Sequence, residues 1–401
     1  MVSLLIRYAN VFKLVGCQAL AMTGNSVLFT VAALIGANLV TDSRWATFPL
    51  ALLHLGTMIV TIPASLAMAK WGRSRGFGGG ILVGMAGASL GSYAVVAHSF
   101  ILFCLAMFLL GAFNAFVGYY RFAAAEVATE SFRSVAISLV VAGGVVAAIL
   151  GPQLATWSRL LLSEAVYAGS LLVIIALQIL SLPLLASVQF PDWTLQTHTE
   201  TGRPLRQIMT QPVFAVAVVG SMVGYGVMVL IMTATPLSMV ADHFPFEQAA
   251  FVIQWHILGM FAPSFITGSL IARFGVLTIM GVGGVLNLAC ITINLLGMSL
   301  GHYWGALLLL GIGWNFLYVG STTLLTEAYA PPERLKTQAA HDFLMFSAVT
   351  VATLISGSAL HMGGWPIVNW LGLPLVVTSL VVTLWLRHHR RHQSLKPSLQ
   401  G

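Results

Sequence analysis

Polar side chains that can bind a solute or carry a proton recur at matched places in the two halves of this chain. Asn114 and Asn315 lie 201 residues apart, and His54 and His256 lie 202 apart, in a chain of 401 residues. Amides donate and accept hydrogen bonds, and histidine changes its charge near neutral pH. The common spacing predicts a duplicated protein with equivalent polar groups in each half.

The composition predicts that these residues lie within a membrane. The chain is 58% hydrophobic and 7% charged, whereas soluble domains carry roughly 25% charged residues. Residues 76–120, 274–326 and 343–386 contain no Asp, Glu, Lys or Arg, and each stretch is long enough for two passes of about 20 residues. The net charge of +7 comes without a contiguous basic patch, so we expect no nucleic-acid partner.

The elements that position these residues are twelve apolar stretches long enough to cross a membrane as helices. They cover residues 14–39, 46–69, 77–97, 100–125, 134–158, 163–188, 212–240, 248–272, 276–298, 303–328, 337–361 and 365–387. We therefore expect an all-α membrane protein with two six-helix bundles, residues 1–190 and 212–388. A cytoplasmic linker at 191–211 joins them, and a basic cytoplasmic tail follows at 389–401.

Lysine and arginine predict the orientation. With a cytoplasmic N-terminus, only Arg44 and Arg159 of the 18 Lys and Arg residues fall outside, as the positive-inside rule requires. Both termini are therefore expected in the cytoplasm, in an integral protein of the inner membrane.

No sequence pattern predicts catalysis or a bound cofactor. The chain lacks the Gly-x-x-x-x-Gly-Lys-Ser/Thr nucleotide motif and the His-Glu-x-x-His zinc motif. Cys17, Cys104 and Cys290 are an odd, scattered set within apolar runs, which predicts packing rather than disulfides or a metal site. We expect a protein that is not an enzyme, without cofactor or metal.

The twelve predicted helices in two repeats resemble the major facilitator superfamily. That family carries a Gly-x-Leu-Ala-Asp-Arg-x-Gly-Arg-Arg pattern after its second helix. Residues 65–75, Ser-Leu-Ala-Met-Ala-Lys-Trp-Gly-Arg-Ser-Arg, are similar to it, and residues 268–275 repeat part of it. Alanines at 69 and 272 replace the family's aspartate.

The resemblance implies a secondary transporter with a gate on its cytoplasmic side. The gate residues are Lys70, Gly72, Arg73, Arg273, Gly275 and the pairs Glu126/Arg133 and Glu327/Arg334.

The same resemblance places the substrate between the halves, against the first, fourth, seventh and tenth helices. The polar and aromatic residues predicted there are Asn25, Asn114, Tyr225, Trp314, Asn315 and Tyr318. Amides in lipid must be hydrogen-bonded, so the alternative is that the asparagines join helices. For the aromatic residues the alternative is ordinary packing.

Four residues are predicted for proton coupling or a polar switch, namely His54, His256, Arg121 and Glu126. The alternatives are that the histidines only pack and that Arg121 reaches the cytoplasmic surface. Met107 stands where proton antiporters of the family have an arginine.

The predicted function is alternating-access transport of a small organic solute, either drug-like or a metabolite. A partial match of residues 142–152 to a Gly-Pro helix of exporters favours efflux. Import of a metabolite or metal chelator is the alternative, and a non-transporting membrane sensor is the rival. The expected partners are the solute and membrane lipids, with protons as a candidate driving ion and the protein acting as a monomer.

Overall fold

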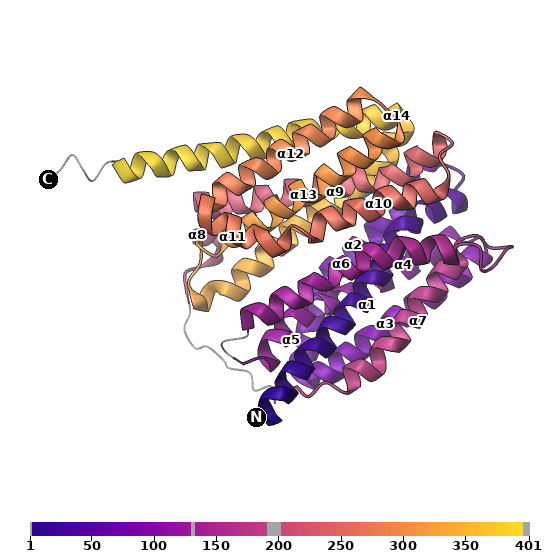
Figure 1. Ribbon diagram of the computed structural model, residues 1–401, viewed down its shortest axis with the longest axis horizontal. Helices are drawn as coiled ribbons and strands as arrows, with labels where there is room; N and C mark the ends of the chain where they lie inside the picture. Colours follow the sequence, from indigo (N-terminus) through magenta and orange to yellow (C-terminus); the bar gives the residue numbers. More distant parts are fainter. Residues whose placement is uncertain (1, 130–132, 191–201, 396–401) are drawn as a thin grey trace.

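The computed structural model describes residues 2–129, 133–190 and 202–395. Within these ranges the regular structure is entirely helical, and no strand occurs among them. Figure 1 shows two groups of long helices side by side, one from indigo to magenta and one from pink to yellow. This confirms the predicted all-α fold with two helical repeats.

The N-terminal half is built from seven α-helices and one short 3₁₀ turn. They are α1 (Val2–Leu39), η1 (Ser43–Trp45), α2 (Phe48–Trp71), α3 (Arg73–Val96), α4 (Phe100–Val117), α5 (Tyr120–Val127), α6 (Arg133–Ser158) and α7 (Ala168–Ala186). The C-terminal half contains α8 (Leu205–Met209), α9 (Pro212–Ala241), α10 (Phe246–Phe261), α11 (Ser264–Phe274), α12 (Val276–Leu296), α13 (Leu300–Leu325), η3 (Pro331–Glu333) and α14 (Arg334–Leu395).

Twelve membrane spans follow from these helices. Ten stretches of the described chain are long and apolar enough to cross a membrane, and the bent pair of α10 and α11 makes an eleventh. The 62-residue α14 has non-helical backbone at Gly363 and Gly364, so it supplies two spans. The chain is therefore an integral, multi-pass membrane protein.

Two predicted spans are broken instead of continuous. The predicted helix 100–125 is interrupted between α4 and α5, at Gly118 and Tyr119. The predicted helix 248–272 bends by 42° between α10 and α11. Pro263 lies at that second break and has no N–H to continue the helix.

The predicted linker and tail are only partly described. Residues 191–201 lie outside the described ranges, and the described part of the linker forms α8. Residues 389–395, predicted as a tail, continue α14, and residues 396–401 lie outside the described ranges. The domain limits 1–190 and 212–388 stay predictions.

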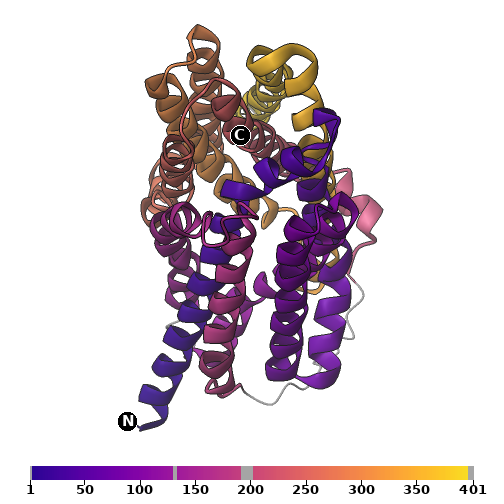
Figure 2. The same cartoon turned by 90° about the vertical axis from the view of Figure 1, so that its right-hand side faces the viewer.

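Hydrogen bonds join the two halves on the side away from the termini. Thr47 donates its hydroxyl to the Thr353 carbonyl at 2.8 Å, and Gln153 donates to Gln254 at 3.0 Å. Arg159 forms an ion pair with Glu247 on the same side. Figure 2 views this end, where η1 and the start of α2 lie against α14. In Figure 1 the ribbons of the two halves lie farther apart toward the termini than at the opposite end.

Candidate functional site

Aromatic rings from four helices meet near the centre of the C-terminal half. Trp314 stacks on Tyr318 with ring centres 5.0 Å apart and planes at 8°. Tyr225 lies edge-on to both, at 5.4 Å from Trp314 and 5.8 Å from Tyr318. Phe346 lies 6.2 Å from Tyr225, and Phe261 lies 6.1 Å from Trp314. The structure thus brings together the three predicted aromatic residues and adds two phenylalanines. We call these five residues the aromatic cluster.

The aromatic cluster borders the other half of the molecule. A Cβ added at Gly144 of α6 would lie 2.6 Å from the Phe261 ring, so α6 passes directly over that ring. Ala148, one turn further along α6, belongs to the same hydrophobic core as Trp314. A solute held against these rings would therefore contact both halves.

The cluster is apolar on its faces and contains a buried donor without a partner among the described residues. The Trp314 side chain is buried, with 5% of the residue exposed, and its Nε1 has no hydrogen-bond partner. Tyr225 and Tyr318 are half-buried. Buried indole N–H groups are normally satisfied, so this one is available to an acceptor. Flat rings with a spare donor suit a planar solute that has polar edges.

Asn315 fixes the break between α10 and α11. Its Nδ2 donates to the Met260 carbonyl and to Ser264 Oγ, both at 2.7 Å, and its Oδ1 accepts from Thr267 Oγ1 at 2.7 Å. The residue is fully buried and its amide is occupied by the protein itself. Its predicted substrate contact stays untested, while this geometry matches the helix-joining alternative.

Replacing Asn315 by alanine is expected to lower stability more than substrate affinity. Three buried bonds at about 0.6 kcal/mol each amount to about 2 kcal/mol. Denaturant unfolding of the purified protein measures this loss. Thr322→Val is the matched control, since Thr322 donates only to Tyr318 in its own helix. Equal stability of the two variants would contradict the assignment.

The other predicted asparagines lie in the N-terminal half. Asn25 lines a small cavity between α1, α4 and α7, together with Gln178. At about 10 Å³, it has room for about one water molecule. Asn114 buries its Oδ1 without a hydrogen bond, and so does Gln18 with its Oε1. Asn114 thus keeps an acceptor for a ligand, whereas Asn25 faces a space too small for a solute.

The two histidines predicted as a matched pair have unlike surroundings. His54 lies 3.2 Å from Thr353 Oγ1, across the boundary between the halves, and stacks on Phe29. His256 Nδ1 lies 2.8 Å from the Leu307 carbonyl within its own half, and its Nε2 is buried without a partner. Their proton-coupling role stays a prediction that this asymmetry does not favour.

The predicted gate motifs form the same turn in both halves. Gly72 ends α2 with φ +86°, and Gly275 ends α11 with φ +85°. These left-handed conformations favour glycine. Lys70 lies 5.7 Å over the Trp71 ring, and Arg273 lies 5.2 Å over the Phe274 ring. The structure thus reproduces the repeat that the sequence spacing indicates.

The acidic gate residues form ion pairs that the sequence did not predict, and the predicted Glu126/Arg133 pair stays a prediction. Glu126 pairs with Arg73 at 2.6 Å. Glu327 pairs with Arg390 at 2.6 Å, while Arg334 is exposed. The Arg133 side chain lies outside the described residues.

Arg73 and Arg121 begin neighbouring helices on the termini side. The Arg73 side chain is only 9% exposed, so its pair with Glu126 is largely buried and holds α3 to α5. Arg121 is half-buried, with its guanidinium 4.8 Å from the Phe122 ring and its Nε buried without a hydrogen bond. The Arg121 side chain is therefore only partly exposed at the surface.

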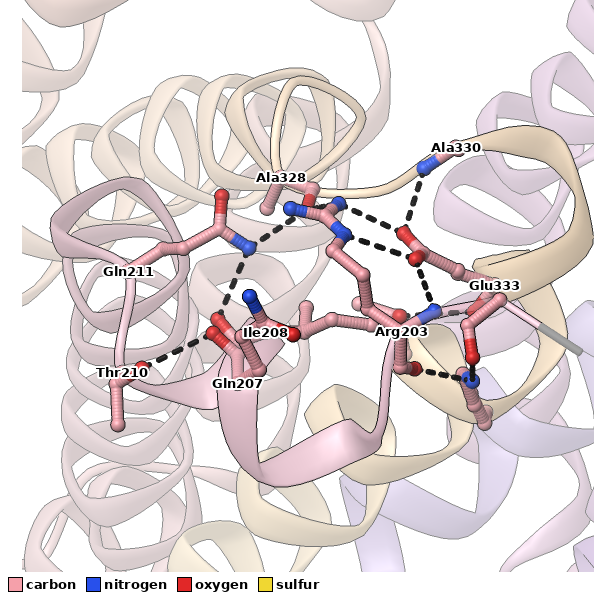
Figure 3. Close-up of polar contacts among 11 residues, drawn as sticks. Arg203, Gln207, Ile208, Thr210, Gln211, Ala328, Ala330 and Glu333 are labelled. Atoms are coloured by element: carbon pink, nitrogen blue, oxygen red, sulfur yellow. Dashed lines mark hydrogen bonds and ion pairs between the residues drawn. The ribbon is translucent and has the colours of Figure 1, made fainter.

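A second ion pair, between a buried Glu333 and an exposed Arg203, attaches the end of the linker to the C-terminal half (Figure 3). Arg203 donates from its backbone N and Nε to Glu333 Oε1, at 2.7 and 2.8 Å, and from Nη2 to Oε2 at 2.7 Å. The Ala330 N–H donates to the same carboxylate. The Arg203 guanidinium, supported by the Ala330 N–H, lowers the pKa of Glu333 to about 2. This carboxylate therefore stays ionised over the physiological range.

The Glu333 contact predicts a pH-dependent contribution to stability. Because the pKa of Glu333 falls from an ordinary 4.5 to about 2, the stabilisation is complete above about pH 4.5 and is lost as the pH falls toward 2. Thermal unfolding of the wild type and Glu333→Gln should differ at pH 6 and converge at low pH. A difference that is independent of pH would show that the ion pair is not its source.

Sequence reasoning missed one polar chain. His341 Nε2 lies 2.8 Å from Ser221 Oγ, and His341 Nδ1 lies 2.9 Å from Asp342 Oδ1. The available signal was the His-Asp pair near the start of the predicted helix 337–361. Phe261 and Phe346 of the aromatic cluster were missed as well, since nothing distinguishes them from other apolar residues.

Comparison with known proteins identifies the family. No established protein-family profile matches the chain. The riboflavin transporter RfnT of Brucella anthropi is 41% identical over 374 residues, which cover 93% of this chain and 94% of that protein. The uncharacterized MFS-type transporter YddS of Bacillus subtilis is 28% identical over 391 residues, or 93% of this chain and 89% of that protein. The chain belongs to the major facilitator superfamily. It is therefore a membrane transporter of a small solute, as its resemblance to this superfamily predicts.

Proposed function

We propose that this transporter moves riboflavin, or a flavin close to it, across the membrane. The observation that carries the proposal is the stacked pair of Trp314 and Tyr318 with Tyr225 at its edge. The riboflavin transporter that is 41% identical to the chain supports the same substrate.

Riboflavin matches the chemistry of the aromatic cluster. Its ring system is flat and aromatic, one edge carries carbonyl acceptors, and its side chain carries hydroxyls. Aromatic pairs contribute about 0.5–1.5 kcal/mol each beyond the area that they bury. Trp314 Nε1, Asn114 Oδ1 and Gln18 Oε1 are buried without a hydrogen bond among the described residues. We infer that the indole N–H pairs with a ring carbonyl, and the two amide oxygens with hydroxyls, when the site opens. A neutral solute also suits a site whose predicted residues carry no charge.

Alternating access accounts for the movement. The halves are hydrogen-bonded on the side away from the termini, and both termini are predicted to be cytoplasmic. We infer that the site opens to the cytoplasm in this state, and that rocking the halves exposes it to the other side.

The direction of net transport is independent of the identity of the substrate. Efflux follows from the partial Gly-Pro pattern of residues 142–152, and import is the alternative. Both directions use the same site and differ only in the sign of the net flux. Purified protein in liposomes with a known orientation distinguishes them when the riboflavin gradient is reversed.

Counterflow tests the substrate. Liposomes loaded with unlabelled riboflavin should accumulate labelled riboflavin when they contain the protein, and unlabelled ribitol inside should not drive this exchange because it lacks the ring. Protein-free liposomes give the background. Binding without exchange would favour the sensor over the transporter, and absence of both would reject riboflavin as the substrate.

A further inference from the structure

Ser221, His341 and Asp342 form a continuous hydrogen-bonded chain from α9 to the exposed side of α14. The His341 side chain is 3% exposed, whereas that of Asp342 is 43% exposed. Ser221 is fully buried. A buried imidazole is thus connected to solvent through a carboxylate on the neighbouring residue. Ionisable residues inside a membrane protein are costly and usually functional.

This chain lies one helical turn from the aromatic cluster on both helices. Ser221 precedes Tyr225 by four residues on α9, and Asp342 precedes Phe346 by four on α14. Residues four apart share a helix face, and Tyr225 and Phe346 lie 6.2 Å apart. A change at His341 is therefore adjacent to the rings that we propose bind the solute.

Charged groups of the other half lie around a tyrosine that is close to Asp342. Tyr119 lies close enough to Arg73, Arg121 and Asp342 to interact electrostatically with all three. On its own half, Tyr225 lies one helical turn from Ser221 and its ring centre is 5.8 Å from that of Tyr318. The carboxylate is thus placed where the halves must meet when the termini side closes.

We propose that His341 and Asp342 form the proton-binding site through which this transporter is coupled to a pH gradient. This inference rests on the proposed solute site, because it assigns the coupling to residues directly beside it. Among the described residues, the histidines predicted from sequence contact Thr353 (His54) and the Leu307 carbonyl (His256), and neither is hydrogen-bonded to a carboxylate.

Proton binding changes both charge and hydrogen bonding. An ionised carboxylate only accepts, so His341 donates from Nδ1 to Asp342 and accepts at Nε2 from the Ser221 hydroxyl. A proton from solvent then binds at Nε2, and Ser221 Oγ becomes the acceptor. The Ser221 hydrogen turns to the carbonyl four residues earlier in α9. The His341–Asp342 pair thereby changes from a net charge of −1 to 0.

Neutralisation makes closure on the termini side less costly. Closing the halves there removes water from Asp342. Arg73 is already paired with Glu126, which leaves Arg121 as the nearby counter-charge, and burying an incompletely compensated charge is unfavourable. With a proton on His341, the carboxylate is buried as a neutral pair. The same residues therefore couple proton binding to the conformational change, for either import or efflux.

Infrared difference spectroscopy tests the site without a substrate. Difference spectra of the wild-type protein between acidic and alkaline buffer should contain an imidazole band that is absent from His341→Gln. His302→Gln is the matched control, since His302 is bonded only to Ser299 at the start of α13. A difference spectrum unchanged by His341→Gln would overturn the proposal.

Flux measurements test the coupling. In liposomes, His341→Gln and Asp342→Asn should lose solute accumulation driven by a pH gradient while retaining riboflavin counterflow. His302→Gln should retain both. Full gradient-driven accumulation in His341→Gln, or its loss only in His54→Gln or His256→Gln, would reject the assignment. Absence of riboflavin counterflow in the wild type would reject the flavin proposal. The infrared band would then be the remaining test of the proton-binding site.

Discussion

Trp314→Ala is expected to weaken riboflavin binding by about tenfold or more. The substitution removes the indole ring that we propose contacts the flavin beside Tyr318 and Tyr225. Each aromatic contact is worth about 0.5–1.5 kcal/mol, and 1.4 kcal/mol corresponds to a tenfold change in Kd. Titration of riboflavin fluorescence with purified protein measures the Kd of each variant.

Two variants separate ligand contact from general destabilisation. Trp314→Phe keeps an aromatic face and loses only the N–H donor, so its Kd should lie between those of the wild type and Trp314→Ala. Trp157→Ala removes a tryptophan that is 65% exposed on α6, away from the aromatic cluster, and should leave the Kd unchanged. Equal Kd values for the wild type and Trp314→Ala would place the flavin elsewhere.

Gly111→Ala is expected to destabilise the N-terminal half by about 1–3 kcal/mol, the usual cost of overpacking. A Cβ at Gly111 of α4 would lie 2.0 Å from the carbonyl oxygen of Leu53 in α2. The clashing atom belongs to the backbone, so no side-chain rotation relieves the contact and the two helices must separate. Thermal unfolding of the purified variant measures the loss.

Gly79 provides a matched control for this substitution, and Gly311 provides a second test of the same effect in the other half. Gly79→Ala in α3 places its Cβ in open space and should be neutral or slightly stabilising, because alanine is the better helix former. Gly311→Ala in α13 should behave like Gly111→Ala, since its Cβ would lie 2.4 Å from the His256 carbonyl. A Gly111→Ala protein as stable as Gly79→Ala would show that α2 and α4 do not pack this closely.

The amino-acid sequence by itself determined the membrane fold and its duplication. Span length depends only on consecutive apolar residues and the thickness of the bilayer, so the spans could be predicted without knowledge of their packing. The repeat of Lys70 and Gly72 as Arg273 and Gly275 likewise predicted two equivalent turns, because a glycine-dependent backbone angle is a local property.

Three members of the aromatic cluster could also be predicted from sequence. Tyr225, Trp314 and Tyr318 stand at mid-depth in helices that face the centre of this family's fold. Phe346 and Phe261 could not be predicted, since an apolar residue in an apolar span gives no sign of the face on which it packs. Their place depends on how α10 and α14 cross α9 and α13.

Only the tertiary structure decided which buried polar groups are hydrogen-bonded within the protein and which have no partner. Asn114 and Asn315 stand at equivalent positions in the two halves of the sequence. The Asn315 amide forms three hydrogen bonds around the helix break near Pro263, whereas Asn114 Oδ1 has none among the described residues. The link from Asp342 through His341 to Ser221 joins residues about 120 positions apart. A buried polar group must find a partner within hydrogen-bond distance, and that partner is set by helix packing that no local pattern in the sequence records.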